Sequence, residues 1–198
     1  MNPHARGAGL YTAGMDDVDP ERLTVVNYPH PVLTRVAEPV AEIDDRVRRV
    51  AERMIELMHE RRGVGLAAPQ VGLPWRMFVA NPGPGEGDEA EAGAPGGGDR
   101  VYVNPKLVDA GAATSARDEG CLSLPGVTAE ITRPVAITIE ATDLDGQAFR
   151  VRSEAFAARV WQHEFDHLEG VLLLDRMTRV DRMANRRAVR ALEAEHAG

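Results

Sequence analysis

The chain has 198 residues, of which 43% are hydrophobic and 27% are charged, and its formal net charge is -8 at pH 7. This composition is ordinary for a soluble globular protein with one full core, and the negative charge argues against nucleic-acid binding through overall charge, so we expect no specific DNA partner. The sequence has neither an apolar run near the roughly 18 residues of a membrane span nor the apolar stretch of a signal peptide, so we expect a cytoplasmic protein.

The N-terminal part of the chain combines an unpatterned arm with one strong helix. Residues 1–20 show no periodicity and are rich in Gly, Ala and Asp, so we expect a flexible arm, within which Met15 is an alternative start. A helix is expected over about residues 45–62, because Val, Leu and Met recur there at helical spacing with Arg and Glu between them. Asp44 or the next aspartate can cap its start, and Gly63 can end it.

The middle of the chain is expected to contain strands separated by irregular segments. Residues 63–72, with the sequence GVGLAAPQVG, are too glycine-rich for a helix or a regular strand. Residues 81–100 form a Gly-, Pro- and acid-rich insert that cannot bury enough apolar surface to offset its ordering entropy, so we expect a disordered surface loop. Residues 116–126 predict an irregular, turn-rich segment. Strand character is found in three segments, at residues 75–81, 101–108 and 135–143.

The C-terminal part is expected to contain a hairpin followed by two helices. Residues 144–147 predict a turn into a further strand, and Ser153 and Glu154 are expected to start a helix that runs to Leu168. Beyond it we expect a stop at Gly170, a short buried strand or turn at 171–175 and a final helix at about 178–195. Strands precede the late helices without βαβ alternation, so the fold class is α+β.

The sequence WQHEFDHLEG contains two histidines that can bind one metal ion. His163 and His167 are four residues apart, so they share one face of the expected helix with the apolar Phe156 and Val160. Two inward imidazoles one turn apart are a good chelating pair for a zinc-like cation, and the adjacent Glu164 is placed as a general base. A polar stretch on an ordinary surface helix is the alternative explanation of this short pattern.

A catalytic site of this kind needs a third protein ligand and an open position for water. Cys121 is the only cysteine, which excludes an intrachain disulfide, and its thiolate is a strong ligand for divalent iron, cobalt or zinc; a small buried hydrophobic side chain is the alternative. Gly63 and Gly65 allow a positive φ or a close approach of a ligand to the backbone, although a plain turn explains them as well. Gln70 offers an amide that can donate to an oxyanion.

Three segments, taken together and in this order, resemble the motifs of peptide deformylases. Residues 63–70 match the family pattern GxGLAAPQ, residues 119–123 match EGCLS, and residues 162–170 match QHExDHLxG. The resemblance covers roughly residues 20–178. It implies an α+β fold with antiparallel sheets packed around a central helix that carries the HExxH motif. It also implies a hydrolase that removes the formyl group from the N-terminal formylmethionine of newly made polypeptides.

The resemblance implies a metal centre with a built-in base. Cys121, His163 and His167 are expected to hold one divalent metal ion, with Fe2+ as the usual ion and Zn2+, Ni2+ or Co2+ as substitutes. Glu164 is expected to take the proton of the attacking water and to return it to the leaving amine.

The resemblance also implies how the substrate is held. The Gln70 amide and the backbone N–H of Leu122 are expected to stabilise the tetrahedral oxygen. Gly65, Val64 and the nearby backbone are expected to pair with the substrate peptide as an added strand. Val64, Leu122 and Val160 are candidates for the apolar pocket of the methionine side chain.

Four other positions complete the prediction for the site. Glu119 and Asp166 are candidates for carboxylates that support the ligands, with Glu119 paired to Arg133, and a solvated carboxylate is the alternative for each. Many bacterial members of the family have an arginine seven residues after the cysteine, where this chain has Thr128. Peptide affinity or preference is expected to differ as a result, whereas the metal chemistry is not.

We therefore expect an arm over 1–20, a metal-dependent deformylase domain over 21–178 and a C-terminal helix over 179–198. That helix is basic and is a candidate for contact with ribosomal RNA, with a solvated helix face as the alternative. Its arginines are Arg179, Arg182, Arg186, Arg187 and Arg190. Two other functions stay open, namely a zincin-type peptidase built on HExxH alone and a binding protein that keeps the metal without activity.

Overall fold

The computed structural model describes residues 18–83 and 98–197. Most of the predicted flexible arm, including Met15, and most of the predicted 81–100 insert therefore lie outside the described residues. No helix in the described part of the chain is long and apolar enough to cross a membrane. The predicted division of the chain after residue 178 stays a prediction.

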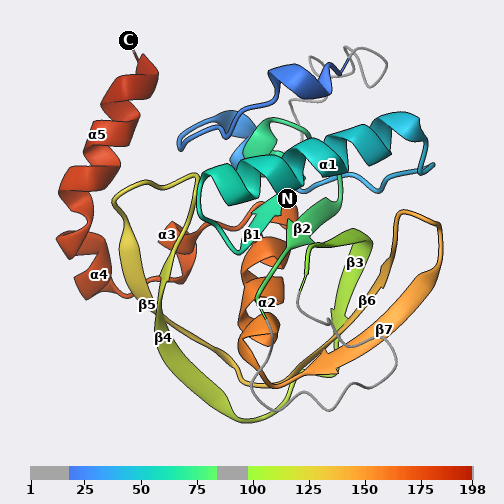
Figure 1. Cartoon of the computed structure of the whole chain (residues 1–198). Coiled ribbons are helices and arrows are strands. Elements are labelled where there is room, and N and C mark those ends of the chain that lie inside the picture. Colours follow the sequence, from blue (N-terminus) through green and yellow to red (C-terminus); the bar gives the residue numbers. More distant parts are fainter. Residues whose placement is uncertain (1–17, 84–97, 198) are drawn as a thin grey trace, which may run out of the picture.

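Two antiparallel sheets form the frame of the molecule (Figure 1). The larger sheet has the strand order β1-β2-β3-β6-β7, and the smaller sheet pairs β4 with β5. The strands span Gly65–Ala67 (β1), Met77–Ala80 (β2), Arg100–Val108 (β3), Thr114–Gly120 (β4), Thr128–Pro134 (β5), Ile137–Thr142 (β6) and Ala148–Ser153 (β7). The expected α+β class with antiparallel sheets is confirmed.

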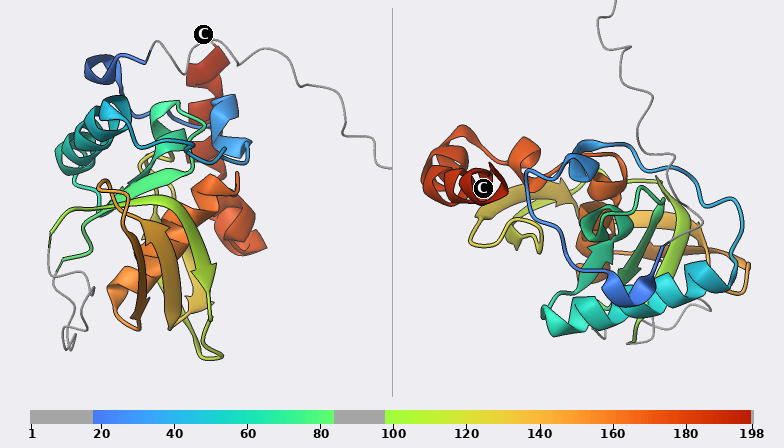
Figure 2. Two further views of the ribbon diagram at one scale, coloured as in Figure 1. Left: turned by 90° about the vertical axis from the view of Figure 1, so that its right-hand side faces the viewer. Right: turned by 90° about the horizontal axis from the view of Figure 1, so that it is seen from above.

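One helix, α2, runs through the middle of the molecule and packs against strands of both sheets, whereas α1 covers β1 and β2 (Figures 1 and 2). The helices span Asp45–Glu60 (α1), Phe156–Leu168 (α2), Leu173–Arg176 (α3), Arg179–Ala184 (α4) and Arg186–Ala197 (α5). Short 3-10 helices span Pro20–Arg22 (η2), Pro31–Thr34 (η3) and Ala68–Val71 (η4). The motif-bearing α2 is therefore held on several sides.

The start of α1 agrees with the sequence, but its end differs by two residues. The Asp44 side chain accepts hydrogen bonds from the backbone N–H groups of Arg46 and Val47, at 3.0 and 2.9 Å, as an N-cap does. The helix ends at Glu60, and the left-handed residue that follows it is Arg62, with φ of 55°, rather than Gly63. Gly63 does not end the helix but lies close to the Leu122 side chain: a Cβ at position 63 would be 2.7 Å from the Leu122 Cδ1 atom.

Two segments that were predicted as irregular contain strands. Residues 63–72 include the three-residue β1, whose pairing with β2 the glycine content did not indicate. Residues 116–120 belong to β4, so the prediction of an irregular segment holds only for the part after Gly120. The partner strand β5 was not predicted at all, because its buried side contains only two apolar residues, Ala129 and Ile131, followed by Arg133. Each of these strands pairs with the next strand along the chain, and this pairing does not show in the composition of either strand alone.

The predicted hairpin is present, but the helix after it starts later than expected. Asp143 accepts hydrogen bonds from the backbone N–H groups of Asp145 and Gln147, and Gly146 has a φ of 79°. The predicted helix start at Ser153 is wrong: this residue ends β7, and its Oγ accepts from the N–H of Ala155 at 3.1 Å. The register of β6 with β7 extends the strand to this point.

The chain after α2 is more helical and more broken than predicted. Residues 171–175, predicted as a buried strand or turn, contain most of the single-turn helix α3 instead. The final helix is two helices, α4 and α5, which meet at Asn185. Leu192 of α5 is buried in a cluster with Leu124 and Val127, so the C-terminal helices pack on the segment that follows β4.

Candidate active site

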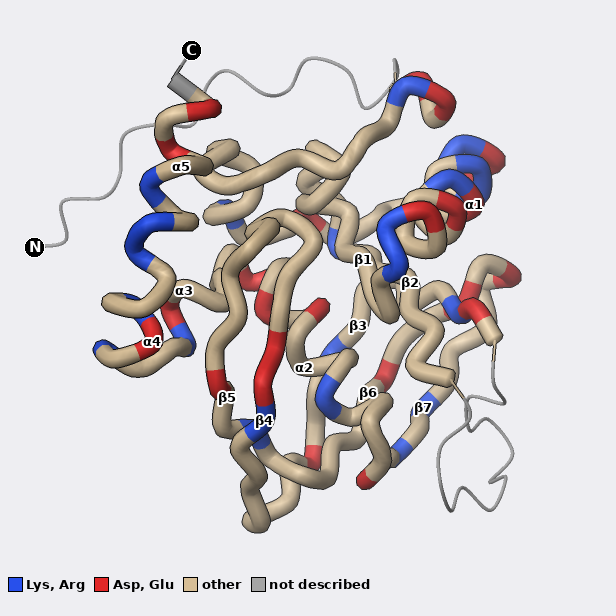
Figure 3. The backbone as a smooth tube through the Cα atoms, turned by 60° about the vertical axis from the view of Figure 1, so that its left-hand side comes forward, with Lys and Arg blue, Asp and Glu red and all other residues tan. Residues whose placement is uncertain are grey.

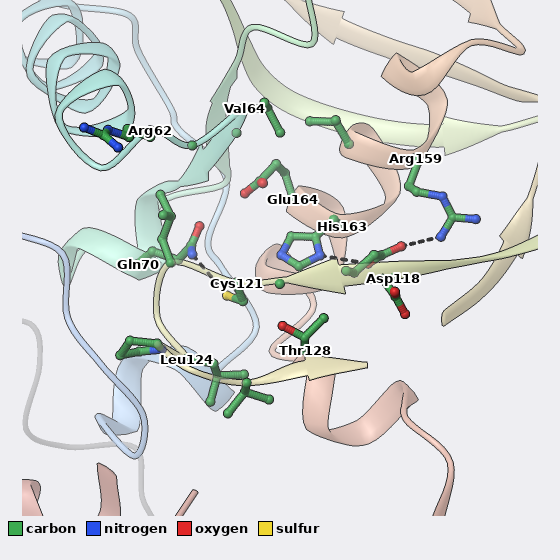
Figure 4. Close-up of a pocket in the computed structure, with 18 of the residues that line it drawn as sticks. Arg62, Val64, Gln70, Asp118, Cys121, Leu124, Thr128, Arg159, His163 and Glu164 are labelled. Atoms are coloured by element: carbon green, nitrogen blue, oxygen red, sulfur yellow. Dashed lines mark hydrogen bonds and ion pairs between the residues drawn. The ribbon is translucent and has the colours of Figure 1, made fainter. Parts of the chain in front are cut away.

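Three segments that are far apart in the sequence meet at one cavity of about 440 Å³ (Figure 4). The first contains β1 and η4, the second contains the end of β4 and the loop after it, and the third is α2. Gln70, Cys121, His163 and Glu164 all line the cavity. His167 lies deeper, with 1% of its surface exposed.

Cys121, His163 and His167 form a group whose ligand atoms all lie within 4.8 Å of one another. Cys121 Sγ is 3.2 Å from His167 Nε2, so the thiol and the ring face each other. One sulfur and two imidazole nitrogens form a donor set that suits zinc or ferrous iron and leaves a position for water. The buried Glu164 Oε2 atom has no hydrogen-bond partner among the described residues. These residues fit one divalent metal ion.

Burial and neighbouring charges shift the protonation of this group. Burial raises the pKa of the Cys121 thiol, but the His167 and His163 rings outweigh it and lower that pKa to about 5. Burial alone lowers the pKa of His163, yet Cys121 and Glu119 raise it well above its usual value. Burial raises the pKa of Glu164 to about 7. The site therefore favours a thiolate next to a carboxyl group that exchanges its proton near neutral pH.

Glu119 lies behind His163 and fixes the orientation of its ring. His163 Nδ1 is 3.0 Å from Glu119 Oε2, which leaves Nε2 of the same ring free for a metal ion. Arg133 donates from Nε and Nη2 to the two oxygens of Glu119, at 2.7 and 2.9 Å, which confirms the predicted pairing. Although burial raises the pKa of Glu119, His163 and Arg133 lower it to about 2. The carboxylate therefore stays ionised behind the ring.

Asp166 is held in the same buried network. Arg133 Nη1 donates to Asp166 Oδ2 at 2.9 Å, and Arg176 of α3 donates to both oxygens of Asp166. Asp166 has 7% of its surface exposed, so the alternative of a solvated carboxylate does not apply to it or to Glu119. This network ties α2 to β5 and α3.

The Gln70 side chain is oriented by its own carbonyl oxygen. Gln70 Oε1 accepts from the backbone N–H of Ala67 at 2.8 Å, so the amide nitrogen faces the other way. That nitrogen is 3.5 Å from Cys121 Sγ and donates to Ser123 Oγ at 3.3 Å. An N–H donor is therefore presented next to the group of possible metal ligands.

The apolar side chains proposed for the methionine pocket all line the cavity. Val64, Leu122 and Val160 come from the three different segments. Phe156, which is 46% exposed, lines the cavity as well. Arg159 was not among the predicted site residues, although it precedes His163 by four residues and so shares its helix face. Arg159 lines the cavity and donates to Glu119 Oε1 at 2.6 Å.

Comparison with known sequences identifies relatives over most of the chain. The family described as Polypeptide deformylase matches residues 22–183. A peptide deformylase from Rhizobium meliloti is 41% identical over 170 residues, which cover 85% of this chain and 93% of the relative. Peptide deformylase 1B of Arabidopsis thaliana, described as chloroplastic/mitochondrial, is 39% identical over 176 residues, or 88% of this chain; the match spans 61% of that longer protein.

Solved structures show the same arrangement of elements. The crystal structure of the plant peptide deformylase PDF1B superposes with a TM-score of 0.81 at 38% identity and covers 91% of this chain and 94% of the plant chain. The peptide deformylase of Thermotoga maritima gives a TM-score of 0.71 at 38% identity, over 79% of this chain and 97% of the other. Sequence, fold and the cluster of cysteine and histidines agree: the chain belongs to the peptide deformylase family, whose members remove the formyl group from N-terminal formylmethionine.

Proposed function

We propose that this chain is a hydrolase that deformylates newly made polypeptides, with Glu164 as the general base and with Cys121, His163 and His167 as the metal ligands. The observation that carries the proposal is that a thiol, an imidazole and a buried carboxyl group line one cavity, with a second imidazole in the same group of possible ligands. A zincin built on HExxH alone has no role for the cysteine or for Gln70, whose amide nitrogen lies 3.5 Å from Cys121 Sγ.

Each residue of the site has its own role in the proposed reaction. Cys121, His163 and His167 would hold a divalent ion, which would supply Lewis acidity that lowers the pKa of water from about 15.7 toward about 7. Glu164 accepts the proton of the attacking water and later delivers it to the leaving amine. The Gln70 amide and the backbone N–H of Leu122 donate hydrogen bonds to the oxygen that becomes negative at the formyl carbon. Glu119 keeps the His163 ring in place during these steps.

The two walls of the cavity suit an extended peptide. Within the described part of the chain, β1 pairs only with β2 and β4 pairs only with β5, so each strand has one edge that no neighbour in its sheet occupies. The cavity is lined by Val64 and Gly65 from one wall and by Gly120 from the other. We propose that the backbone at Val64 and Gly65 pairs with the substrate as an added strand. Val64, Leu122 and Val160 then surround the methionine side chain.

Formate release decides between deformylation and internal peptide cleavage. The purified metal-loaded chain is incubated with formyl-Met-Ala-Ser and, separately, with the same peptide carrying an acetyl group. We expect formate and free Met-Ala-Ser from the first peptide and no internal cleavage of either. Cleavage between Met and Ala without formate release would contradict the proposal.

The Cys121→Ser variant tests the proposed thiolate ligand. Because a hydroxyl group is a weaker ligand than a thiolate for these ions, the variant is expected to retain less metal after dialysis and to lose activity. Undiminished metal content together with undiminished activity would exclude Cys121 as a ligand.

For the native ion we propose Fe2+, although zinc, nickel and cobalt suit the same donor set. Metal analysis after anaerobic purification, with formate assays for each added ion, tests this choice.

We also propose that the C-terminal helices contact the ribosome. Figure 3 shows the basic residues along α4 and α5, and the apolar Val180 and Met183 of α4 are 75% and 78% exposed. The five arginines of these helices are all exposed, which supports contact with a phosphate backbone. Co-sedimentation of the chain with ribosomes is expected to fall with rising salt and to be lost after truncation at Met177. Unchanged co-sedimentation of the truncated chain would contradict this proposal.

A cytoplasmic location of the protein stays a prediction.

A further inference from the structure

The break between α4 and α5 places an amide side chain against a wall of the cavity. Asn185 lies at this break, and its Nδ2 donates to the carbonyl oxygen of Thr128 at 2.8 Å. The backbone N–H of Thr128 donates in turn to Asn185 Oδ1 at 3.3 Å. Thr128 is the first residue of β5 and lines the cavity (Figure 4). One side chain therefore satisfies both backbone groups at the start of this strand.

This pair of hydrogen bonds resembles the pairing of one strand with another. Thr128 is opposite Gly120 in the register of β5 with β4, and among the described strands β5 has no neighbour on its other side. The amide of Asn185 occupies that side at Thr128. A third hydrogen bond, from Asn185 Nδ2 to the carbonyl oxygen of Asp181 at 2.9 Å, ties the same amide to α4. The position of Thr128 is therefore coupled to that of the C-terminal helices.

Apolar packing holds the rest of this wall from the same side. Leu124 and Val127 line the cavity, and they also share a buried cluster with Leu192 of α5. Tyr28 fixes the same loop by donating from its backbone N–H to the carbonyl oxygen of Ser123 at 2.9 Å. The loop between β4 and β5 thus has the cavity on one side and α5 on the other, as the views of α5 beside β5 indicate (Figure 1).

The short side chain of Thr128 makes its backbone position important. A threonine reaches only a few ångströms from its Cα, so a contact between Thr128 and a bound peptide depends on where the backbone of β5 is held. We infer that Asn185 is a positioning residue for peptide binding: it fixes Thr128, and through it the C-terminal helices support one wall of the substrate groove from behind. This inference rests on the proposed function of the cavity in binding the peptide. It assigns the C-terminal helices a role that does not require the ribosome.

The variant Asn185→Ala tests the inference by separating binding from chemistry. We expect KM for formyl-Met-Ala-Ser to rise about threefold to tenfold, as one or two lost neutral hydrogen bonds imply, with kcat unchanged. Metal content after dialysis is expected to stay at the wild-type level. The Kd of the product peptide Met-Ala-Ser, measured by calorimetry, is expected to rise by a similar factor. A loss of kcat with unchanged KM and Kd would overturn the inference.

Asp181→Ala is the matched control, because it loosens α4 without removing a bond to Thr128. The Asp181 side chain pairs with Thr178 at the start of α4, where the Thr178 hydroxyl donates to Asp181 Oδ2 at 2.6 Å. We expect wild-type KM and Kd for this variant, and an equal rise in both variants would overturn the inference.

A second variant, Asn185→Asp, keeps the acceptor for the Thr128 N–H and loses the donor. If the alanine variant does not fold, this one decides: KM and Kd are expected to rise above the wild-type values, because the carbonyl oxygen of Thr128 loses its donor, and wild-type values would overturn the inference. Should the wild-type chain release no formate, the proposed function fails, whereas the calorimetric comparison still decides the role of Asn185.

Discussion

Gly65 of β1 lies directly against the carboxylate of Glu164 of α2. A Cβ atom at position 65 would be 2.7 Å from Glu164 Cδ and 2.8 Å from its Cγ, distances that side-chain carbons do not adopt. Glu164 is 4% exposed and lines the cavity, so an added Cβ at position 65 would push its carboxylate out of its present position. Position 65 requires a glycine because β1 approaches Glu164 closely. A left-handed backbone is not the reason, since the φ of Gly65 is outside that region.

The Gly65→Ala variant is therefore expected to displace the base without touching a proposed metal ligand. We expect kcat for formate release to fall by about 10²-fold, the order of magnitude attributed to a positioned general base, while metal content stays at the wild-type level. Activity is measured as formate release per bound metal ion.

A double variant shows whether this loss acts through Glu164. In the Glu164→Gln background, Gly65→Ala is expected to cause little further loss, because residues that act as a unit are not additive. If the fold-decrease in kcat of the double variant equals the product of the two single decreases, Gly65 acts independently of Glu164, for example through its backbone contact with the peptide.

Gln70 offers a variant that removes the donor and keeps the fold. In Gln70→Glu the carboxylate still accepts from the Ala67 N–H, which Gln70 Oε1 contacts at 2.8 Å, but it has no N–H to offer the substrate oxygen. We expect kcat to fall about 10²–10³-fold, the typical cost of one lost oxyanion donor, and the thermal midpoint to fall below that of the wild type, because the new carboxylate is buried beside Cys121. A variant that keeps more than half of the wild-type kcat would remove Gln70 from the mechanism.

Arg133 is expected to matter for stability because it pairs with two buried carboxylates. Replacing it with Met leaves Glu119 and Asp166, 8% and 7% exposed, without their shared partner, and such losses cost about 3–5 kcal/mol. Arg176 also binds Asp166, but its side chain is 49% exposed, so Arg176→Met is expected to cost only about 1 kcal/mol or less. Urea unfolding of both variants measures the difference in the free energy of unfolding. Equal losses would contradict the view that Arg133 stabilises the two buried carboxylates more than Arg176 does.

Tyr102 predicts a loss of stability in base. Its hydroxyl is buried and accepts from Trp161 Nε1 at 2.9 Å, and burial raises its pKa from 10.0 to about 12. Because the folded-state pKa lies above the unfolded one, the stabilisation is complete below pH 10 and is lost as pH rises through about 12, up to about 3 kcal/mol.

Comparison with Tyr102→Phe isolates this effect from other titrations. At pH 8 the variant is expected to be less stable by about 1–3 kcal/mol, because the buried Trp161 N–H loses its acceptor. Between pH 10 and pH 12 its thermal midpoint is expected to fall less than that of the wild type. Parallel curves for the two proteins over this range would show that Tyr102 does not titrate on unfolding.

Local rules predicted the parts of the structure that depend on neighbours in sequence. The Asp44 cap, the hairpin around Asp143 and the shared face of His163 and His167 all follow from spacing and short-range hydrogen bonds. The pairing of Glu119 with Arg133 came from resemblance to the family and is confirmed by the contacts.

The parts that depend on distant segments were not predictable from local sequence. Spacing alone could not place Cys121 next to His167, because the turn of the chain through β5, β6 and β7 brings them together. The strand β4 has no large apolar residue, and β5 buries only Ala129 and Ile131 as apolar side chains, so neither has a strong pattern of its own. The helix break at Asn185 was not predicted either, and the bonds of its side chain to Thr128 are present only in the folded chain.

The activity of Glu164→Gln at matched metal content tests the central claim most directly. Glutamine keeps the size of the side chain but cannot take a proton from water, so the variant is expected to bind the metal ion as the wild type does. Formate release from formyl-Met-Ala-Ser per bound ion is expected to fall by about 10²–10⁴-fold, the range for a lost general base. Wild-type turnover by the metal-loaded variant would contradict the account, because the proton would then have another acceptor.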